Sequence, residues 1–410
     1  MPEFFTLVPP EEARRRILEH IHPLAEQETI PAMEALGRVL AADITSPQIL
    51  PEFRRCTVDG YAVRARDTFG ASESLPAYLR LVGEVPMGRT ADFTLGPGEV
   101  ALVHTGGSVP DGADAVVMIE NTQQTGEDEI EVRRPAAPGD NLIEPGEDIR
   151  TGELILPAGH RIREQDIGGL MAVGITEVTV TRRPRVAVFA TGDEVIPPDQ
   201  ATRPGQVRDI NSYTVATLAR GAGAEVELGG ILPDRFEVIY ERVKEAIERG
   251  ADMVVLSAGS SVSVRDMTAD VFERLGEPGV LVHGIATRPG KPTILGVGDG
   301  IALVGLPGNP VSAFVQFLMV CTPVIYRLQG ADVPRSLFVR ARLTTNVAST
   351  AGREDYVPAR LIERDGELWA DPIFFKSNLI FTLVKADGLL RVPLNVTGLE
   401  AGQPVDVRLF

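Results

Sequence analysis

Residues 301–320 read IALVGLPGNPVSAFVQFLMV, and this stretch decides the fold expected for the chain. Ile301–Val304 is an apolar run as short as a buried parallel strand. The turn residues Gly305–Asn309 end the run, and Pro310 suits the first turn of a long apolar helix with Asn309 as its candidate cap. This order places free backbone N–H groups at the carboxyl edge of an open α/β sheet, where anions bind. A plain strand-to-helix connection is the alternative.

The composition bounds the kind of protein. A length of 410 residues predicts about two to four domains, and 44% hydrophobic residues are enough for real cores. The 41 glycines and 31 prolines fall between short segments, which indicates many turns and several small β units. The net charge of −17 argues against a nucleic-acid or anionic-membrane surface, so any anion site must be local.

The cysteines and the amino terminus favour a cytoplasmic protein. Cys56 and Cys321 show no metal-binding or disulfide-framework spacing, as expected in a reducing compartment. The first residues, MPEFFTLVPPEEARRR, lack a signal-peptide core. Because no uninterrupted apolar run reaches 18 residues, no membrane span is expected.

Periodicity divides the chain into four predicted domains. A helical and linker domain comprises residues 1–45, with a second helix beginning near Pro31, together with residues 146–183. Residues 46–145 offer short strands between Gly, Pro and Asp clusters and form a β-rich insertion domain. Residues 184–327 alternate strands and helices, which predicts a three-layer α/β/α domain around a mostly parallel sheet. Residues 328–410 form a carboxyl-terminal β domain, a small barrel or sandwich.

Five polar loops follow strands of the predicted α/β domain, so they are expected at one sheet edge. They are Thr191–Glu194, Pro233–Arg235, Ser257–Ser263 leading to Asp266, Arg288–Pro292 and Pro307–Pro310. Small residues let a ligand approach the backbone, and hydroxyls and loop N–H groups hold phosphate oxygens. The candidate ligand-binding residues in these loops and the following helix are Ser257, Ser261, Arg288, Lys291, Pro307, Gly308, Asn309 and Ser312.

Three carboxylates in these loops form a candidate Mg²⁺ site. Glu194, Asp234 and Asp266 offer the oxygen ligands that Mg²⁺ prefers, with phosphate and water completing the coordination. Each loop by itself has a simpler explanation: Thr191–Glu194 as a turn, Asp234 and Asp266 as helix caps, and Lys291 as a solvated side chain. The sequence shows no recognisable Ser–His–Asp arrangement. Five histidines and two cysteines are few ligands for a zinc site, so none is expected.

The insertion domain carries further acidic turns. Asp59 stands on a glycine turn before a strand, Thr105 precedes two glycines, and Asp148 follows Gly146 and Glu147. Ordinary turn chemistry explains most such residues. From the residues alone they form a second acidic surface without an assigned purpose.

The ordered set of motifs resembles a known family. The motifs are Asp59–Ala62, Thr105-Gly106 with Pro110–Val117, Gly146–Ile149, Thr191–Glu194, Pro289–Pro292 and Leu306–Ser312. In this order they resemble the molybdopterin molybdenumtransferases (the MoeA family), which are similar to the carboxyl-terminal domain of gephyrin. The resemblance covers nearly the whole chain.

The resemblance implies an elongated homodimer with a MoaB/Mog-like molybdopterin-binding domain at residues 184–327. It implies that adenylylated molybdopterin loses AMP while molybdate is ligated, with Mg²⁺ as cofactor. Catalytic roles would fall to Asp59, Asp148, Glu194 and Asp266, with Asp59, Thr105 and Asp148 supplied by the other subunit. A molybdopterin adenylyltransferase or molybdoenzymes would be transient partners.

The chain departs from the family pattern in its third loop. Ala258, Ser260 and Ser263 replace two glycines and a valine, and Val264 stands where the family has an acid. Arg288 stands where a lysine is usual, which keeps the charge but changes the geometry. Two rival functions follow: a non-catalytic paralogue that binds or delivers the cofactor, motivated by Val264, and a gephyrin-like scaffold.

Overall fold

A computed structural model of the protein describes residues 7–258, 262–334, 336–374 and 376–410, with only the backbone at 262–265. The chain groups into two compact units. The first comprises Met1–Ala42, Ala158–Arg163 and Glu177–Phe410, and the second comprises Asp43–Pro157 and Glu164–Thr176.

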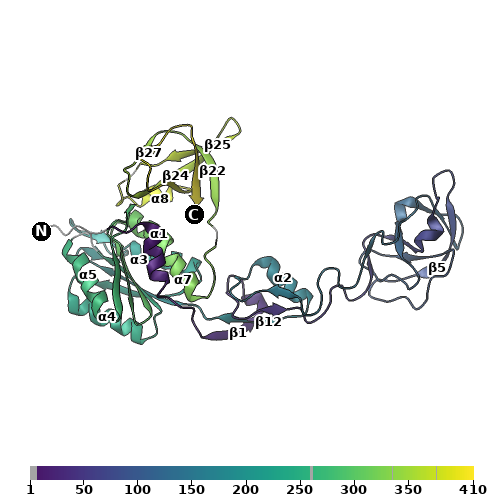
Figure 1. The fold of residues 1–410 in the computed structure, drawn as a ribbon, viewed down its shortest axis with the longest axis horizontal. Coiled ribbons are helices and arrows are strands. Elements are labelled where there is room, and N and C mark those ends of the chain that lie inside the picture. Colours follow the sequence, from purple (N-terminus) through teal and green to yellow (C-terminus); the bar gives the residue numbers. More distant parts are fainter. Residues whose placement is uncertain (1–6, 259–261, 335, 375) are drawn as a thin grey trace. The chain divides into compact units, whose positions relative to one another are not determined.

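The first unit contains the predicted α/β domain, built on a six-stranded sheet (Figure 1). The first four strands in the sheet order pair in parallel, the fifth pairs antiparallel with the fourth, and the sixth pairs antiparallel with the fifth. In spatial order the strands are β16 (Glu225–Leu232), β13 (Arg185–Thr191), β17 (Met253–Ala258), β21 (Ile301–Pro307), β20 (Ile294–Gly298) and β18 (Pro278–His283).

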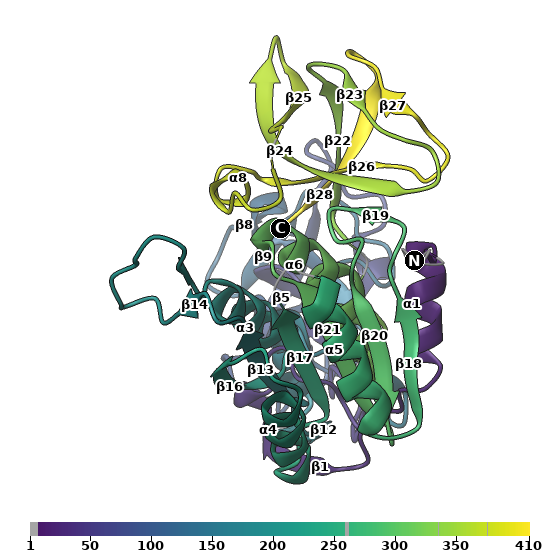
Figure 2. The same ribbon diagram turned by 90° about the vertical axis from the view of Figure 1, so that its left-hand side faces the viewer.

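Helices cover both faces of this sheet, which confirms the three-layer prediction (Figure 2). One face carries α4 (Phe236–Glu248) and α5 (Val262–Arg274). Ile239 of α4 and Phe272 of α5 pack on residues of the sheet. The other face carries α1 (Pro10–Leu18), α3 (Asn211–Gly221), α6 (Pro310–Gln316) and α7 (Thr322–Leu328). The strands read as continuous apolar runs because both faces are buried.

The 301–320 stretch forms the expected strand and helix with two differences. Strand β21 continues through Gly305 and Leu306 to Pro307, so the predicted turn begins later. Asn309 occupies the N-cap position of α6 without a capping bond and donates instead to the Ser377 hydroxyl at 2.9 Å. The helix continues through a π-helical turn, Phe317–Cys321, into α7. By length and composition Pro310–Leu328 would suffice to cross a membrane, yet 72% of its apolar window is buried inside the protein.

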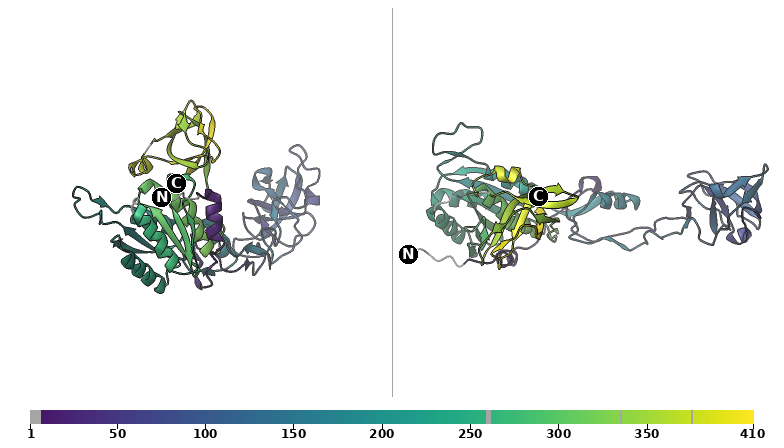
Figure 3. Two further views of the ribbon diagram at one scale, coloured as in Figure 1. Left: turned by 60° about the vertical axis from the view of Figure 1, so that its left-hand side comes forward. Right: turned by 90° about the horizontal axis from the view of Figure 1, so that it is seen from above.

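A long excursion separates β13 from α3. Its two short strands, β14 (Val195–Ile196) and β15 (Val207–Arg208), pair in parallel and enclose a loop that leaves the body of the α/β domain (Figure 3). Sequence reasoning did not predict these strands.

The carboxyl-terminal region is a closed five-stranded barrel, because the first and last strands of the ring also pair with each other. The ring comprises β24 (Glu354–Arg364), β25 (Glu367–Pro372), β22 (Phe338–Leu343), β28 (Pro404–Leu409) and β26 (Gly388–Val392). Accessory elements are β23 (Val347–Ala348), β27 (Gly398–Leu399) and α8 (Phe381–Val384). Strand β19 (Thr287–Arg288), from the loop after β18, pairs in parallel with β24.

The predicted second helix near Pro31 is wrong. Strand β1 (Gln27–Pro31) pairs antiparallel with β12 (Glu177–Thr181), and only a 3₁₀ turn, Ala32–Glu34, follows. Met33 and Leu36, which the predicted helix would contain, are 75% and 50% exposed. The long-range pairing overrides a local pattern that is too short to decide between helix and strand.

The second unit is β-rich, as predicted. Its main sheet contains, in spatial order, β7 (Ala115–Met118), β4 (Gly60–Val63), β6 (Glu99–Val103), β5 (Ala77–Glu84), β9 (Glu129–Val132) and β8 (Thr122–Gln124). Two short pairs, β2 (Ile44–Thr45) with β11 (Leu154–Leu156) and β3 (Arg55–Cys56) with β10 (Leu142–Ile143), accompany the helix α2 (Glu164–Ala172).

Candidate functional site

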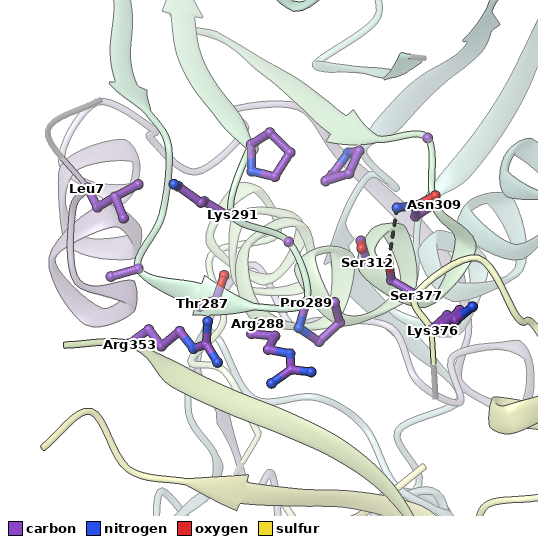
Figure 4. Close-up of a pocket in the computed structure, with 15 residues that line it drawn as sticks. Leu7, Thr287, Arg288, Pro289, Lys291, Asn309, Ser312, Arg353, Lys376 and Ser377 are labelled. Carbon is purple, nitrogen blue, oxygen red and sulfur yellow. Dashed lines mark hydrogen bonds between the residues drawn. The ribbon is translucent and has the colours of Figure 1, made fainter. Parts of the chain in front are cut away.

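A cavity of about 530 Å³ lies where the loops after β18 and β21 face the carboxyl-terminal barrel (Figure 4). The two loops are the predicted Arg288–Pro292 and Pro307–Pro310 segments, and Ser312 of α6 also lines the cavity. The barrel side contributes Arg353, Lys376 and Ser377. The candidate residues Arg288, Lys291, Pro307, Gly308, Asn309 and Ser312 therefore meet in one place.

This first cavity is rich in positive charge. Arg288, Lys291, Arg353 and Lys376 line it (Figure 4). The buried Asp355 carboxylate contacts both arginines. The Asp355 oxygens lie 3.6 Å from the Arg288 guanidinium and 3.0 Å from that of Arg353. Lys291 and Lys376 have no ion pair within the described parts of the chain. The lining therefore suits an anion with several oxygens.

A second cavity, of about 520 Å³, opens at the same sheet edge. It is lined by the predicted loop residues Thr191, Glu194 and Ser257, and by residues of the β14–β15 excursion. Gly308 and Asn309 line both cavities, so the loop after β21 is their common wall. The convergence of loops on one edge, predicted from the alternation of strands and helices, is confirmed for these four loops.

Asn211, at the start of α3, ties the second cavity together and was missed by sequence reasoning. Its side-chain amide donates to the Ser257 hydroxyl and to the Gly308 carbonyl, each at 2.8 Å. Because a carbonyl only accepts, these bonds fix the orientation of the amide. The sequence did offer a signal for the start of this helix in Asp209. The Asp209 carboxylate accepts a hydrogen bond from the Ser212 N–H at 3.0 Å, as side chains at helix starts do.

Among the carboxylates proposed to bind Mg²⁺, Asp234 has other acidic side chains close to it. Asp234 lies next to Asp193, whose carboxylate accepts from the Asp234 N–H at 3.4 Å. Burial, together with the negative charges of Asp193 and Glu194, raises the pKa of Asp234. One Asp234 oxygen is buried with no hydrogen-bond partner in the described structure. A divalent cation would relieve both features, so these residues fit one.

No set of three or more His, Cys, Asp or Glu side chains within the described residues is arranged to hold a metal. Asp266 lies inside α5, which begins at Val262 rather than near Met267, so Asp266 does not cap that helix. Asp234 does not cap α4 either, because Arg235 occupies the N-cap position. Ser261 lies outside the described residues.

In the second unit, two of the predicted residues lie together. The Asp59 carboxylate accepts from the Thr105 backbone N–H at 2.8 Å and from the Thr105 hydroxyl at 3.1 Å. These bonds lower the pKa of Asp59 and keep it ionised. Asp148 is exposed, and its backbone N–H donates to the Leu50 carbonyl at 3.0 Å.

An α/β/α domain with a cation-rich cavity at its sheet edge, followed by a β-barrel, defines a protein of the open α/β class with a candidate anion site. Residues 8–174 match the MoeA N-terminal region (domain I and II), residues 187–327 match a probable molybdopterin binding domain, and residues 340–410 match the MoeA C-terminal region (domain IV). The chain belongs to the MoeA family of molybdopterin molybdenumtransferases.

Similar proteins extend over the whole chain. A molybdopterin molybdenumtransferase of Bacillus subtilis is 33% identical over 414 residues, covering 100% of this chain and 96% of the relative. Molybdopterin molybdenumtransferase 2 of Mycobacterium tuberculosis is 34% identical over 408 residues, covering 96% and 99%. A crystal structure of a molybdopterin biosynthesis MoeA protein from Pyrococcus horikoshii superposes with a TM-score of 0.86 at 32% identity, covering 99% of this chain and 100% of that one.

Proposed function

We propose that this chain is an enzyme that inserts molybdenum into molybdopterin during molybdenum cofactor synthesis. The observation that carries the proposal is the cation-rich first cavity, which shares the Gly308-Asn309 wall with a second polar cavity. Full-length relatives named molybdopterin molybdenumtransferase support it. Molybdate and adenylylated molybdopterin are the substrates, and AMP is released.

Molybdate binds in the first cavity in this proposal. A tetrahedral dianion matches the Arg288 and Arg353 guanidiniums, which Asp355 contacts, and the Lys291 and Lys376 ammoniums. The hydroxyls of Ser312 and Ser377 add neutral donors. Asp355 lowers the net charge of the cavity, so the anion is held without a large excess of positive charge.

Adenylylated molybdopterin occupies the second cavity and reaches the first across the shared wall. Ser257 and Thr191 provide hydroxyls for its phosphate groups, and Asn211 keeps the β17 and β21 loops at a fixed separation. Water attacks the pyrophosphate and breaks its P–O–P bond, which gives AMP and the phosphate monoester of molybdopterin. The two thiols of molybdopterin then bind the molybdenum, and one molybdate oxygen leaves as water with the two thiol protons. Holding both reactants at adjoining sites supplies the proximity that the transfer requires.

Glu194 and Asp234 are the residues proposed to hold Mg²⁺, with Asp266 as a further ligand once substrate is bound. When bound, Mg²⁺ neutralises charge on the pyrophosphate oxygens. With few preformed protein ligands, the remaining coordination would come from phosphate and water, as is usual for this ion.

The working form is proposed to be a cytoplasmic homodimer in which the partner subunit's insertion domain completes each site. Asp59, kept ionised by Thr105, and the exposed Asp148 are the acids that this domain offers for positioning water. Molybdopterin adenylyltransferase and molybdoenzymes are proposed as transient partners, and no nucleic acid or membrane is expected.

The direct test is release of AMP from adenylylated molybdopterin in the presence of molybdate and Mg²⁺. We expect turnover that requires both additions and that Asp266→Asn abolishes while leaving pterin binding largely intact. A protein that binds the pterin without releasing AMP above background would instead be the non-catalytic paralogue.

A further inference from the structure

The segment Arg288–Lys291 is held from inside the protein at three of its carbonyls. The Pro289 carbonyl accepts from the Gln316 side-chain amide at 3.1 Å, and the Gly290 carbonyl accepts from the Thr293 hydroxyl at 2.7 Å. The Lys291 carbonyl accepts from the Ile285 N–H at 2.9 Å. The anion-facing segment is therefore fixed by its interior contacts.

Gln316 makes the contact that sequence reasoning did not anticipate. It is the last residue of α6, is fully buried, and also donates to the Thr287 hydroxyl at 3.0 Å. Gly290 packs directly on it: a Cβ at Gly290 would lie 2.2 Å from the Gln316 amide nitrogen, and the φ of Gly290 is +110°. Only glycine allows this close approach.

The bond to Pro289 sets the direction of the next backbone donor. In a planar trans peptide the C=O and the following N–H point in opposite directions. The Pro289 carbonyl points toward Gln316, which does not line the first cavity, whereas Gly290 and Lys291 do line it. The Gly290 N–H therefore points to the cavity side, and neither it nor the Lys291 N–H has an acceptor among the described residues.

Stability alone does not account for Gln316. Its neighbours in the chain, Val315 and Phe317, are fully buried and apolar. The side-chain amide oxygen Oε1 of Gln316 is buried without a hydrogen-bond partner in the described structure. An unpaired buried polar atom is costly, so an apolar residue of similar size would suit a purely structural position. A buried polar group retained at such a cost beside a binding loop points to a role in that loop.

We propose that Gln316 is a positioning residue for oxyanion binding, which turns the Gly290 N–H into the first cavity and keeps Arg288 and Lys291 on either side of it. This inference rests on the proposed function, since it takes molybdate as the anion. Gln316 does not touch the anion and acts through the Pro289 carbonyl and the Thr287 hydroxyl.

The chain provides a matched control in Gln329, the C-cap residue directly after α7. Gln329 is also buried, its amide donates to the Ala222 and Ile325 carbonyls at 2.9 and 3.1 Å, and it packs on Gly223, another glycine with positive φ. It does not line the first cavity. Gln316→Leu and Gln329→Leu therefore remove equivalent buried amides at different distances from the anion.

The experiment measures molybdate binding to the full chain by isothermal titration calorimetry, with sulfate as a second probe, and the thermal midpoint of each variant. We expect both variants to lose similar stability, while Gln316→Leu weakens molybdate binding about tenfold or more, the value of one hydrogen bond to a charged group. Gln329→Leu should stay within about twofold of wild type. In turnover, the KM for molybdate should rise in Gln316→Leu with the KM for adenylylated molybdopterin unchanged.

The possible results distinguish the role of Gln316 from the proposed function. If Gln316→Leu binds molybdate as tightly as the wild type does, the role of Gln316 is overturned and the proposed function is not. The same holds if both variants bind molybdate equally weakly. A wild-type protein that binds neither molybdate nor sulfate overturns the proposed function as well. If Gln316→Leu does not fold, Gln316→Met, which is flexible and similar in volume, carries the same comparison.

Discussion

At the scale of single residues, the two cavities depend on buried polar groups whose partners are distant in sequence. Asp355 contacts Arg288 and Arg353, and Asn211 joins Ser257 to Gly308. The predicted arginine and lysine lie in the first cavity, whereas their buried counter-charge was not predicted.

Asp234→Asn is expected to stabilise the protein while removing its dependence on Mg²⁺. Burial and the charges of Asp193 and Glu194 raise the pKa of Asp234 above its ordinary value of 3.8. The folded state therefore binds this proton more tightly than the unfolded state, and stability is lost as the pH rises from 3.8 through the raised value. Above the raised pKa the penalty is fully present, so the asparagine variant should there unfold at a higher temperature than wild type without Mg²⁺.

Thermal unfolding across pH, with and without Mg²⁺, checks this prediction alongside AMP release. The gain in thermal midpoint should shrink as the pH falls toward the ordinary pKa of an aspartate. A variant that is less stable than wild type at pH 7, or that still responds to Mg²⁺, would contradict the assignment of Asp234.

Arg353→Ala should cost stability because it leaves the buried Asp355 with only its longer contact to Arg288. Removing one partner of a buried ion pair is destabilising, and since Arg353 is partly exposed we expect roughly 1–3 kcal/mol in urea unfolding. The KM for molybdate should rise as well. Arg360→Ala, which breaks the exposed Arg360–Asp371 pair, is the control and should cost less than about 1 kcal/mol. Equal costs for the two variants would show that Asp355 does not need Arg353.

At the scale of elements, the strongest predictions came from long periodic segments. The hydrophobic pattern predicts strands at Glu177–Thr181 and Glu225–Leu232 and a helix at Phe236–Arg249. Strands β12 and β16 and the helix α4 lie within one residue of these bounds. Errors occurred where a short segment pairs over a long range, as in β1 with β12, or where a glycine continues a buried strand, as Gly305 does in β21. Local patterns carry too little information to decide such cases.

The loop between β19 and β20 provides a test at this scale. Gly290→Ala should disrupt the loop, since the new Cβ would meet the Gln316 amide at 2.2 Å and the backbone φ of +110° disfavours any side chain. Gly300→Ala, in the turn between β20 and β21, is the control: its φ is +88°, but nothing lies within 4 Å of the new Cβ.

We expect Gly300→Ala to cost about 1–2 kcal/mol from backbone strain with normal molybdate binding. Gly290→Ala should cost more and should lose molybdate binding. Calorimetric binding and urea unfolding of both variants measure the difference. Retained binding in Gly290→Ala would mean that the loop geometry is not critical for the anion.

At the scale of the whole molecule, the proposal requires two chains. The first unit carries both cavities, and the second carries Asp59, Thr105 and Asp148. The exposed apolar residues of the second unit include Phe69, Leu75 and Met87, which are 63%, 71% and 58% exposed.

A mixture of two inactive variants tests the shared site. Asp59→Asn should inactivate the contribution of the insertion domain, and Lys291→Ala that of the first cavity. If each site combines residues of two chains, mixed dimers contain one site with both wild-type residues, so mixing should restore a measurable part of the AMP release. Absence of any recovery, with dimers exchanging freely in analytical ultracentrifugation, would place both residues in sites of a single chain.

The amino-acid sequence by itself determined the alternation of strands and helices, the β-rich character of the insertion and of the carboxyl-terminal region, and the loops that carry Arg288, Lys291 and Asn309. These features follow from periodicity and turn chemistry, which act between residues close together in the chain. Tertiary structure alone decided that Asp355 contacts the arginines, that Asn211 joins two loops and that Gln316 supports a third. The reason is physical: a buried polar side chain is retained for the partner it meets after folding, and strand pairing brings that partner from far along the chain.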